Sequence, residues 1–234
     1  MLNKKIILGV GVTNDTLDNI LKYIIENLQK SRNKFYVVTP NAELLVIANK
    51  NKSYKEILNQ AEIASPDSVG LMIGARLEGK TLKERIHGVD LMENLCKEIA
   101  KRPITVGFLG GGPRVAEKVA ERLKAKYPGL KVIFAIEEWP QNDQELICDL
   151  LFVAFGSPKQ EFWIAENFPK INVKAAMGVG GAFDFVSGRV PRAPKYIRKI
   201  GFEWLFRLII QPWRIKRQTA LIKFVVLVIK EKIF

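Results

Sequence analysis

The sequence contains two cysteines and one histidine among 234 residues, so it has few of the side chains that build redox or metal centres. Cys96 and Cys148 lie far apart without C-x-x-C spacing, which indicates reduced thiols in the core of a cytosolic protein. No D-x-D pair occurs, and His87 has no cysteine or carboxylate neighbour at ligand spacing, so no metal site is predicted. We assign His87 to the surface or to a loop rather than to catalysis.

Long hydrophobic runs and the dinucleotide-binding fingerprint are also absent. No window approaches the ~20 uninterrupted apolar residues of a membrane-spanning helix. Residues 1–12 combine lysines with a short apolar run, but they lack the long hydrophobic core and the cleavage site of a signal peptide. Residues 6–12 are therefore predicted to form a first strand. G-x-G-x-x-G does not occur, which weakens assignment to dinucleotide-binding proteins.

The positive charge is concentrated in the C-terminal part of the sequence. The formal net charge is +13, and residues 189–234 hold 12 lysines or arginines against two glutamates. The same region carries large apolar side chains. Trp204 lies on the apolar face of a helix predicted through residues 197–208, and beyond Pro212 the run 224–229 is almost wholly apolar. Cationic helices of this kind are typical of a membrane interface. The alternative is a helical pair that packs on the core and exposes a solvated basic face.

Apolar strands alternate with amphipathic helices through most of the sequence. Strands are predicted at residues 6–12, 36–38, 62–64, 103–109, 131–136, 150–155 and 173–179, and helices at 15–28, 42–50, 54–59, 90–100, 115–127, directly after 140 and directly after 156. The small apolar residues 70–75 are expected to pack close to the sheet. This alternation predicts an α/β fold with a doubly wound, mostly parallel, Rossmann-like sheet at residues 1–194, followed by a basic amphipathic helical appendage at 195–234.

Three of the predicted strands end in the same construction, a hydroxyl residue and a proline that lead into a helix. The segments are T-P-N at 39–41, S-P-D at 65–67 and S-P-K-Q at 157–160. We expect the hydroxyls to cap the helices, with Gln160 in the position of a capping box. Because the carboxyl ends of parallel strands share one edge, Asn41, Asp67 and Gln160 should lie together there, where free helix N–H groups attract phosphate.

A glycine cluster and one carboxylate indicate what chemistry this edge could perform. Gly110, Gly111 and Gly112 precede a helix and allow the backbone to approach a diphosphate closely. Asp67 is the carboxylate that we favour as a general base. A carboxylate in the first turn of a helix is stabilised by the helix dipole, however, and this weakens it as a base. Burial or a neighbouring anion would restore its basicity, and the spacing alone does not decide between the two interpretations.

The strand-end motifs belong to a longer series of sequence blocks that extends to the basic tail. The blocks are T-P-N-A-E at 39–43, P-D at 66–67, E-R at 84–85, G-V-D at 88–90, G-S-P-K-Q-E at 156–161, G-V-G-G-A-F-D at 178–184 and R-A-P at 192–194. Together they resemble the WecG/TagA/CpsF glycosyltransferases. The resemblance implies an inverting, metal-independent transfer of N-acetylmannosamine or a related sugar from a UDP-sugar, without a cofactor. The implied acceptor is a polyprenyl diphosphate-linked glycolipid at the cytoplasmic membrane face, in the synthesis of wall teichoic acid or another surface polysaccharide.

The resemblance also implies roles for individual residues. Asp67 matches the proposed base, and Arg85 matches a contact with the diphosphate or leaving group. The other substrate contacts that the resemblance implies are Thr39, Asn41 and Gln160. From the two glycine clusters we add Gly110, Gly111, Gly180 and Gly181 as candidate substrate-binding residues. The tail resembles the appendage that brings family members to the membrane, and Arg214 and Arg217 are our candidates for arginines that reach the active site. Residues 135–140 depart from the G-x-H-H-G-Y-F-like segment of many relatives, which leaves the donor sugar open.

The sequence leaves two other classes of protein open. A non-catalytic basic module would bind anionic lipid or nucleic acid through its tail, since positive charge attracts any polyanion. The aromatic residues interleaved with this charge favour lipid over nucleic acid; they are Trp204, Phe206, Trp213 and Phe224. A Rossmann-type nucleotide-sugar oxidoreductase is weakened by the missing fingerprint. We therefore expect a cytoplasmic protein peripherally associated with the inner face of the plasma membrane. Its oligomeric state stays open, a homo-oligomer included.

Overall fold

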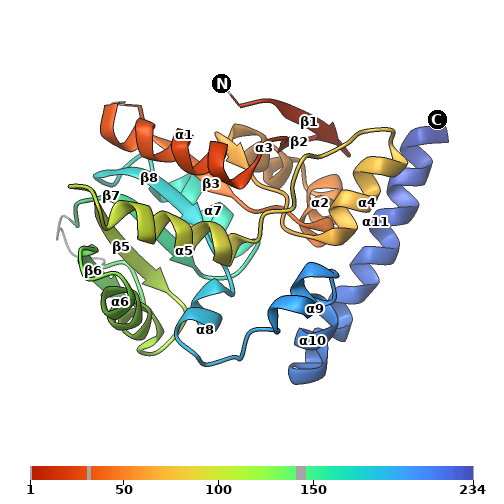
Figure 1. The fold of residues 1–234 in the computed structure, drawn as a ribbon. Coiled ribbons are helices and arrows are strands. Elements are labelled where there is room, and N and C mark those ends of the chain that lie inside the picture. Colours follow the sequence, from red (N-terminus) through yellow and green to blue (C-terminus); the bar gives the residue numbers. More distant parts are fainter. Residues whose placement is uncertain (1, 31–32, 141–145, 234) are drawn as a thin grey trace.

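A six-stranded parallel sheet forms the centre of the molecule in the computed structural model (Figure 1). The structure describes residues 2–30, 33–140 and 146–233, and only the backbone of residues 199, 216–218 and 233. The strands are β3 (Phe35–Val38), β4 (Ile63–Ala64), β5 (Thr105–Gly110), β6 (Lys131–Ile136), β7 (Cys148–Ala154) and β8 (Val173–Gly178). Their order is β4-β3-β8-β7-β5-β6, and all neighbouring pairs are parallel. The predicted α/β fold with a parallel sheet is confirmed.

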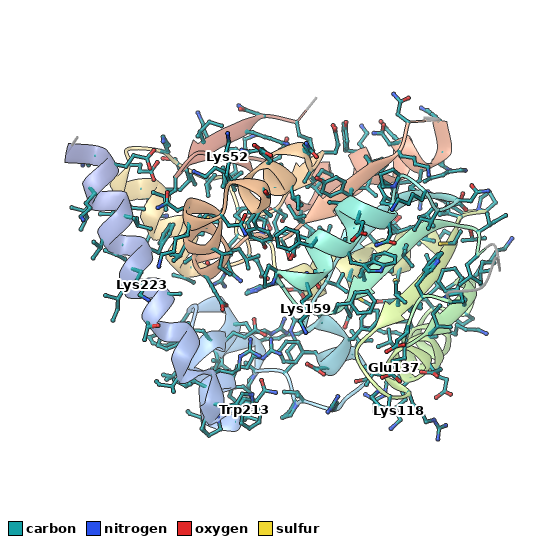
Figure 2. All side chains as sticks on the ribbon, turned by 180° about the vertical axis from the view of Figure 1, so that it is seen from behind. Lys52, Lys118, Glu137, Lys159, Trp213 and Lys223 are labelled. Atoms are coloured by element: carbon teal, nitrogen blue, oxygen red, sulfur yellow. The ribbon has the colours of Figure 1, made fainter. Side chains whose placement is uncertain are left out.

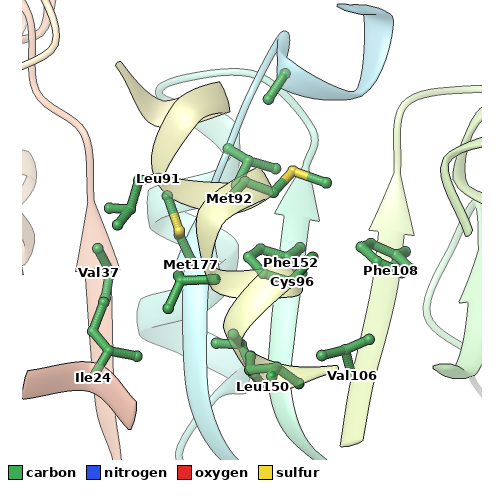
Figure 3. Close-up of a cluster of buried hydrophobic side chains, with 14 of the residues drawn as sticks. Ile24, Val37, Leu91, Met92, Cys96, Val106, Phe108, Leu150, Phe152 and Met177 are labelled. Atoms are coloured by element: carbon green, nitrogen blue, oxygen red, sulfur yellow. The ribbon is translucent and has the colours of Figure 1, made fainter. Parts of the chain in front are cut away.

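Helices cover one face of this sheet and bury alternate side chains of each strand. They are α1 (Leu17–Lys30), α5 (Gly88–Ile99), α6 (Val115–Lys126) and α8 (Ala182–Val186). Figure 3 shows α5 lying across the strands, with Met92 and Cys96 above Phe152 and Met177. Because successive strand residues point to opposite faces, the residues between these belong to a second core on the other side.

The second face carries the remaining helices of the sheet domain. They are α2 (Ala42–Lys50), α3 (Lys52–Gln60), α4 (Val69–Leu77) and α7 (Lys159–Asn167). Leu151 and Val153 of β7 face this side, whereas Leu150 and Phe152 face the first. With both faces covered, β7 is apolar from residue 150 onward rather than alternating, as expected of a buried parallel strand. Cys96 and Cys148 are free, buried thiols, as predicted.

The N-terminal segment differs from the prediction of a single strand at residues 6–12. It forms an antiparallel hairpin of β1 (Lys4–Ile7) and β2 (Val10–Thr13), separate from the main sheet. The chain reverses at Leu8 and Gly9, which have φ angles of 50° and 76°, the left-handed pair that a tight hairpin turn requires. Thr13 Oγ1 accepts a hydrogen bond of 2.9 Å from the N–H of Ala64, and this bond fixes the hairpin beside β4.

Residues 70–75 form part of α4, in which Leu71 and Ala75 pack with Val38 and Ala64 of the sheet, whereas Gly70 and Gly74 face the C-terminal tail. The tail consists of α9 (Lys195–Lys199), α10 (Glu203–Ile210), the 3₁₀ turn η1 (Pro212–Arg214) and α11 (Ile215–Ile233). A Cβ atom on Gly74 would lie 2.3 Å from the ring of Phe224, so only glycine allows this close helix contact. Phe224 and Val228 are fully buried. The tail is therefore anchored to the core through α11, which runs along α2 and α4 (Figure 1).

Two further differences concern the predicted helices. The helix expected through residues 197–208 is broken at Gly201, whose φ of 87° ends α9 and starts a new turn before α10. The helix expected directly after residue 140 lies outside the described residues. Within the described ranges, no helix combines the length and the apolar character that a membrane span needs.

Candidate functional site

A cavity of about 550 Å³ opens at the carboxyl edge of the sheet, where all six strands end. The segments after the strands supply Thr39 and Asn41, Asp67, Gly110 to Gly112, Glu137 and Glu138, Phe155 to Ser157, and Val179 to Gly181. Gln160 of α7 reaches the cavity from the same edge, and Arg207 and Arg214 enter from the tail. Figure 2 shows how far apart the contributing segments are, with Glu137 on one side of the molecule and Trp213, the neighbour of Arg214, on the other.

The three hydroxyl-proline turns reach this edge, but their helices are capped by other residues than predicted. Asn41 Oδ1 accepts from the N–H of Leu44 at 3.1 Å, and Ser68 Oγ accepts from the N–H of Leu71 at 3.2 Å. The expectation that the hydroxyls of Thr39 and Ser65 cap these helices is wrong. Proline holds the residue before it in extended backbone, so each helix begins only after the proline has been passed.

Ser157 does not cap α7 either, because Pro158 occupies the N-cap position and makes no side-chain capping bond. Ser157 Oγ donates instead to Glu161 Oε1 at 2.8 Å. Gln160 Nε2 donates to the same oxygen at 2.8 Å, and Gln160 Oε1 accepts from the N–H of Gly180 at 2.9 Å. Gln160 thus bridges the ends of β7 and β8 rather than completing a capping box. Burial raises the pKa of Glu161, although these hydrogen bonds partly offset it.

Asp67 has the surroundings of a base rather than those of a helix-stabilised carboxylate. It precedes Ser68, the N-cap of α4, so it lies outside the first turn. Its side chain is 29% exposed and lines the cavity. Burial raises the pKa of Asp67 above its ordinary value, and the charge of Glu203 raises it further, while hydrogen bonds from His87 and from the N–H of Gly88 lower it in part. The structure therefore favours the interpretation that burial and a nearby anion maintain its basicity.

His87 lies beside this carboxylate, in the loop that precedes α5, so the prediction of a loop position is confirmed. It occupies the N-cap position of α5, and its side chain is only 17% exposed. Its Nδ1 is 3.1 Å from Asp67 Oδ1 and 3.5 Å from Glu203 Oε2. The sequence carried no signal for this contact, because Asp67 and Glu203 come from segments 20 residues before and 116 residues after it. Only the packing of α5, the 65–68 loop and α10 brings the three together.

Arginines from the last part of the chain enclose the cavity on the tail side. Arg207 of α10 lies 3.6 Å from Asp184 and stacks over the Phe185 ring at 4.6 Å. Gln211 Oε1 accepts from Arg207 Nε at 3.1 Å and from Arg214 Nη1 at 3.2 Å. Sequence reasoning found Arg214 but not Arg189 or Arg207, which also line the cavity. The side chain of Arg217, the other candidate, lies outside the part of the chain that the structure describes.

Comparison with known proteins connects this arrangement to one family. Residues 5–234 match the family described as "Glycosyl transferase WecG/TagA/CpsF family". The chain belongs to this family. It is therefore a glycosyltransferase, and the fold and the family that the sequence blocks indicated are both confirmed.

Three proteins illustrate how the chain compares with other WecG/TagA/CpsF members. All three are named N-acetylglucosaminyldiphosphoundecaprenol N-acetyl-beta-D-mannosaminyltransferase. The Bacillus spizizenii protein is 31% identical over 229 residues, which are 93% of this chain and 89% of that protein. The Bacillus subtilis protein is 29% identical over 233 residues, 96% and 90% of the two chains. A Staphylococcus aureus protein is 29% identical over 238 residues, 97% and 92%.

The glycines of this WecG/TagA/CpsF member form the floor of the cavity. Gly110, Gly111 and Gly112 have φ angles of 100°, 86° and 85°, a left-handed run that only glycine adopts without strain. A Cβ atom on Gly111 would lie 2.7 Å from Val115, so side chains are excluded there as well. Such a loop allows backbone groups to approach a bound anion. Gly180 and Gly181 also line the cavity.

Arg85 is the one predicted contact with a described side chain that does not line the cavity. Its Nη2 donates to the carbonyl oxygen of Arg198 at 2.6 Å and so holds the start of the tail. Glu137 and Glu138, in the segment that departs from many relatives, do line the cavity. Among the described residues no group of three or more His, Cys, Asp or Glu side chains could hold a metal ion.

Proposed function

We propose that this glycosyltransferase moves N-acetylmannosamine, or a related N-acetylated sugar, from a UDP-sugar to a polyprenyl diphosphate-linked acceptor that carries N-acetylglucosamine. The names of the three relatives support the sugar and the acceptor, because they describe an N-acetyl-beta-D-mannosaminyl transfer to N-acetylglucosaminyldiphosphoundecaprenol. The product would enter the synthesis of wall teichoic acid or another surface polysaccharide. The observation that carries the proposal is the position of Asp67, a carboxylate with a raised pKa that faces an arginine-lined cavity at the carboxyl edge of the sheet.

The proposed reaction is a single displacement with inversion. Asp67 takes the proton of the acceptor hydroxyl while its oxygen attacks the anomeric carbon of the donor. The bond from that carbon to the β-phosphate oxygen breaks, and UDP leaves with the bonding electrons. One attack from the side opposite the leaving group inverts the anomeric configuration. A base with a raised pKa suits this step, because general-base efficiency increases as the pKa of the base approaches the working pH.

The side chains around Asp67 supply the remaining contacts in this proposal. Asn41 Oδ1 is occupied by its cap bond, so its amide NH₂ is the group that can face a sugar. Hydrogen bonds to Glu161 and from the N–H of Gly180 fix the Gln160 side chain, which forms a rigid part of the cavity lining. Thr39 contributes a hydroxyl to the same lining. Gly110, Gly111 and Gly112 leave room for the diphosphate, and Gly180 and Gly181 border the sugar.

Arginine side chains would stabilise the charge that develops on departing UDP. Arg189, Arg207 and Arg214 line the same cavity, and guanidinium groups bind phosphate oxygens through two parallel hydrogen bonds. Placed at the leaving group, they supply positive charge where the transition state needs it. This is the role that a divalent metal ion has in many glycosyltransferases that use nucleotide sugars.

Turnover is accordingly expected to stay unchanged when divalent metals are removed. The measurement is the initial rate with wild-type protein in excess EDTA, compared with the rate after added Mg²⁺ or Mn²⁺. Equal rates agree with charge stabilisation by arginine. A loss of activity in EDTA that added metal restores would contradict it.

Exposed apolar side chains on the tail support a role at the membrane surface, where a lipid-linked acceptor would be found. Ile209, Trp213 and Ile222 are 71%, 69% and 69% exposed, although each is large and apolar. Figure 2 shows Lys223 beside the middle of α11 and Trp213 near its lower end. Large apolar side chains can enter the acyl-chain boundary of an anionic bilayer, and neighbouring lysines and arginines can contact its phosphate headgroups. The tail would thus rest on the inner leaflet and hold the cavity next to it.

Replacing these three side chains is expected to release the protein from membranes. Removing the whole tail would also uncover the core around Phe224 and Val228, so the triple variant Ile209→Ser, Trp213→Ser and Ile222→Ser is the better test. Losing about 1 kcal/mol of burial for each side chain lowers partitioning on the order of 100-fold. The measurement is sedimentation with vesicles that contain phosphatidylglycerol.

A control variant substitutes three exposed apolar residues elsewhere on the surface. Ile6, Ile133 and Ile147 are 54%, 53% and 51% exposed and lie outside the tail. Their serine variants should partition like the wild type. Equal partitioning of the tail variant and the control variant would refute the membrane-facing role of the tail.

The proposed reaction itself is tested by product analysis. Wild-type protein is incubated with a short-chain polyprenyl diphosphate N-acetylglucosamine and a panel of UDP-sugars, and the lipid is analysed by mass spectrometry. One N-acetylhexosamine should be added with UDP-N-acetylmannosamine or a close relative. An unmodified lipid with every donor would contradict the proposal.

A further inference from the structure

We propose that His87 and Glu203 are positioning residues for the base: with Asp67 they form one unit that fixes the orientation of the Asp67 carboxylate and sets its affinity for a proton. This inference rests on the proposed function, since it concerns the same base. It adds two residues to the mechanism, one of them contributed by the tail.

A single nitrogen of His87 faces both carboxylates. Nδ1 lies 3.1 Å from Asp67 Oδ1 and 3.5 Å from Glu203 Oε2. Ionised carboxylates only accept hydrogen bonds, so the Nδ1 atom must carry a hydrogen to satisfy them. Its hydrogen therefore points between the two oxygens, closer to Asp67. The Nε2 atom is buried and has no hydrogen-bond partner in the described part of the chain, so no second interaction competes for the ring orientation.

The orientation of Asp67 follows from two donors on the same side. His87 Nδ1–H holds the Oδ1 atom, and the N–H of Gly88, at the start of α5, adds a second hydrogen bond to the carboxylate. The N–H of Asp67 itself donates to the carbonyl oxygen of Pro40 at 3.0 Å, which fixes the backbone. With these contacts in place, the remaining lone pairs of the carboxylate are those available to an acceptor hydroxyl in the cavity.

Glu203 is held in place by charged residues from two other segments. Arg192 Nε lies 3.4 Å from Glu203 Oε1, and the two terminal nitrogens of Arg192 each donate to Asp90 at 2.7 Å. Arg198 approaches the same aspartate at 3.6 Å. The groups around the unit are thus Asp90 from α5, Arg192 and Arg198 from the start of the tail, and Arg85, which holds the Arg198 carbonyl.

The two positioning residues act on the proton affinity of Asp67 in opposite directions. The negative charge of Glu203 disfavours a second anion beside it and strengthens Asp67 as a base. The hydrogen bond from His87 stabilises the anion and weakens it as a base. Glu203 therefore offsets the effect of His87, so that Asp67 is oriented by a hydrogen bond without losing the basicity that burial gives it.

This opposition gives the test, which compares pH profiles of kcat/KM for Glu203→Gln, His87→Leu and His87→Asn. In Glu203→Gln the acid limb should move to lower pH, because Asp67 loses a repelling charge. In His87→Leu the limb should move to higher pH, and kcat should fall about 100-fold with an unchanged donor KM, because Asp67 loses its orienting donor. In His87→Asn the side-chain amide can donate a hydrogen bond from the position of Nδ1. The kcat of this variant should therefore be close to that of the wild type, and its acid limb should lie at the wild-type pH.

Control measurements separate these effects from loss of folding and from failure of the proposed function. Glu231→Gln removes the other acidic charge of the tail, at an exposed position, and should leave the profile unchanged. Thermal unfolding identifies a variant that does not fold. If His87→Leu does not fold, the direction of the acid-limb shift in Glu203→Gln tests the inference. Acid limbs that stay in place or move in the same direction would overturn this inference while an inactive Asp67→Asn still supports the proposed base. Near-normal turnover of Asp67→Asn would overturn both.

Discussion

Asp67→Asn is expected to lower kcat about 1,000-fold, the usual range for removal of a general base in a displacement reaction. The substitution keeps the shape of the side chain, but an amide cannot accept the proton of the acceptor hydroxyl. Affinity for the UDP-sugar should stay within about threefold of the wild type, because we propose that the diphosphate is bound by the glycine loop and the arginines that line the cavity rather than by Asp67. Turnover is measured with the lipid acceptor, and donor affinity by isothermal titration calorimetry.

A control and the pH dependence make this prediction specific to Asp67. Asp18→Asn, at an exposed position in the first turn of α1, should turn over at the wild-type rate. Because burial raises the pKa of Asp67, wild-type activity should be lost on acidification at a higher pH than an exposed aspartate would give. Near-normal turnover of the Asp67→Asn protein would remove this residue from the mechanism.

Arg207→Ala is expected to lower kcat about 100-fold, the effect of losing one well-placed donor to a developing negative charge. Arg207 lines the cavity and stands beside Gly181, where a Cβ atom would lie 2.4 Å from the guanidinium. Its position is fixed by Asp184, by the Phe185 ring and by Gln211, so little reorganisation is needed on binding. Arg207→Lys should recover only part of the rate, because an ammonium group cannot form the paired hydrogen bonds of a guanidinium.

Loss of Arg207 also leaves Asp184 without that partner inside an anion-binding cavity, and this repulsion alone could weaken UDP binding. The double variant Arg207→Ala with Asp184→Asn removes the repulsion. If Arg207 stabilises the leaving group, the double variant should regain donor affinity but not kcat. Arg76→Ala, at an exposed end of α4, is the matched control and should behave like the wild type. An Arg207→Ala protein with kcat within about threefold of the wild type would contradict the role of this arginine.

The sheet and much of the cavity could be predicted from the sequence because local patterns determine them. The run from Leu150 to Ala154 is apolar throughout, which is typical of a parallel strand covered on both faces. Once the strands are parallel, topology places the residues after each strand at one edge. Asn41, Asp67 and Gln160 therefore lie around one cavity although they are distant in sequence.

The parts that were missed depend on contacts between distant segments. Leu8 and Gly9 turn the first apolar run into a hairpin, and this turn interrupts an otherwise regular strand pattern. The contact of His87 with Asp67 and Glu203 was not predicted, because these two partners are far away in the sequence. Arg207 could not be distinguished from the other basic residues of the tail until α10 was placed over the cavity. In each case the packing of the tail and the loops, rather than a local pattern, decides the role.

The central claim is that the residues after the six strands, together with the arginines of the tail, form one UDP-sugar site that Asp67 serves as base. A crystal structure of the Asp67→Asn protein with bound UDP-N-acetylmannosamine tests this most directly. The diphosphate should lie between the Gly110 to Gly112 loop and Arg207, with the anomeric carbon of the sugar facing residue 67. Density for the nucleotide outside this cavity, or a sugar that points away from residue 67, would contradict the account.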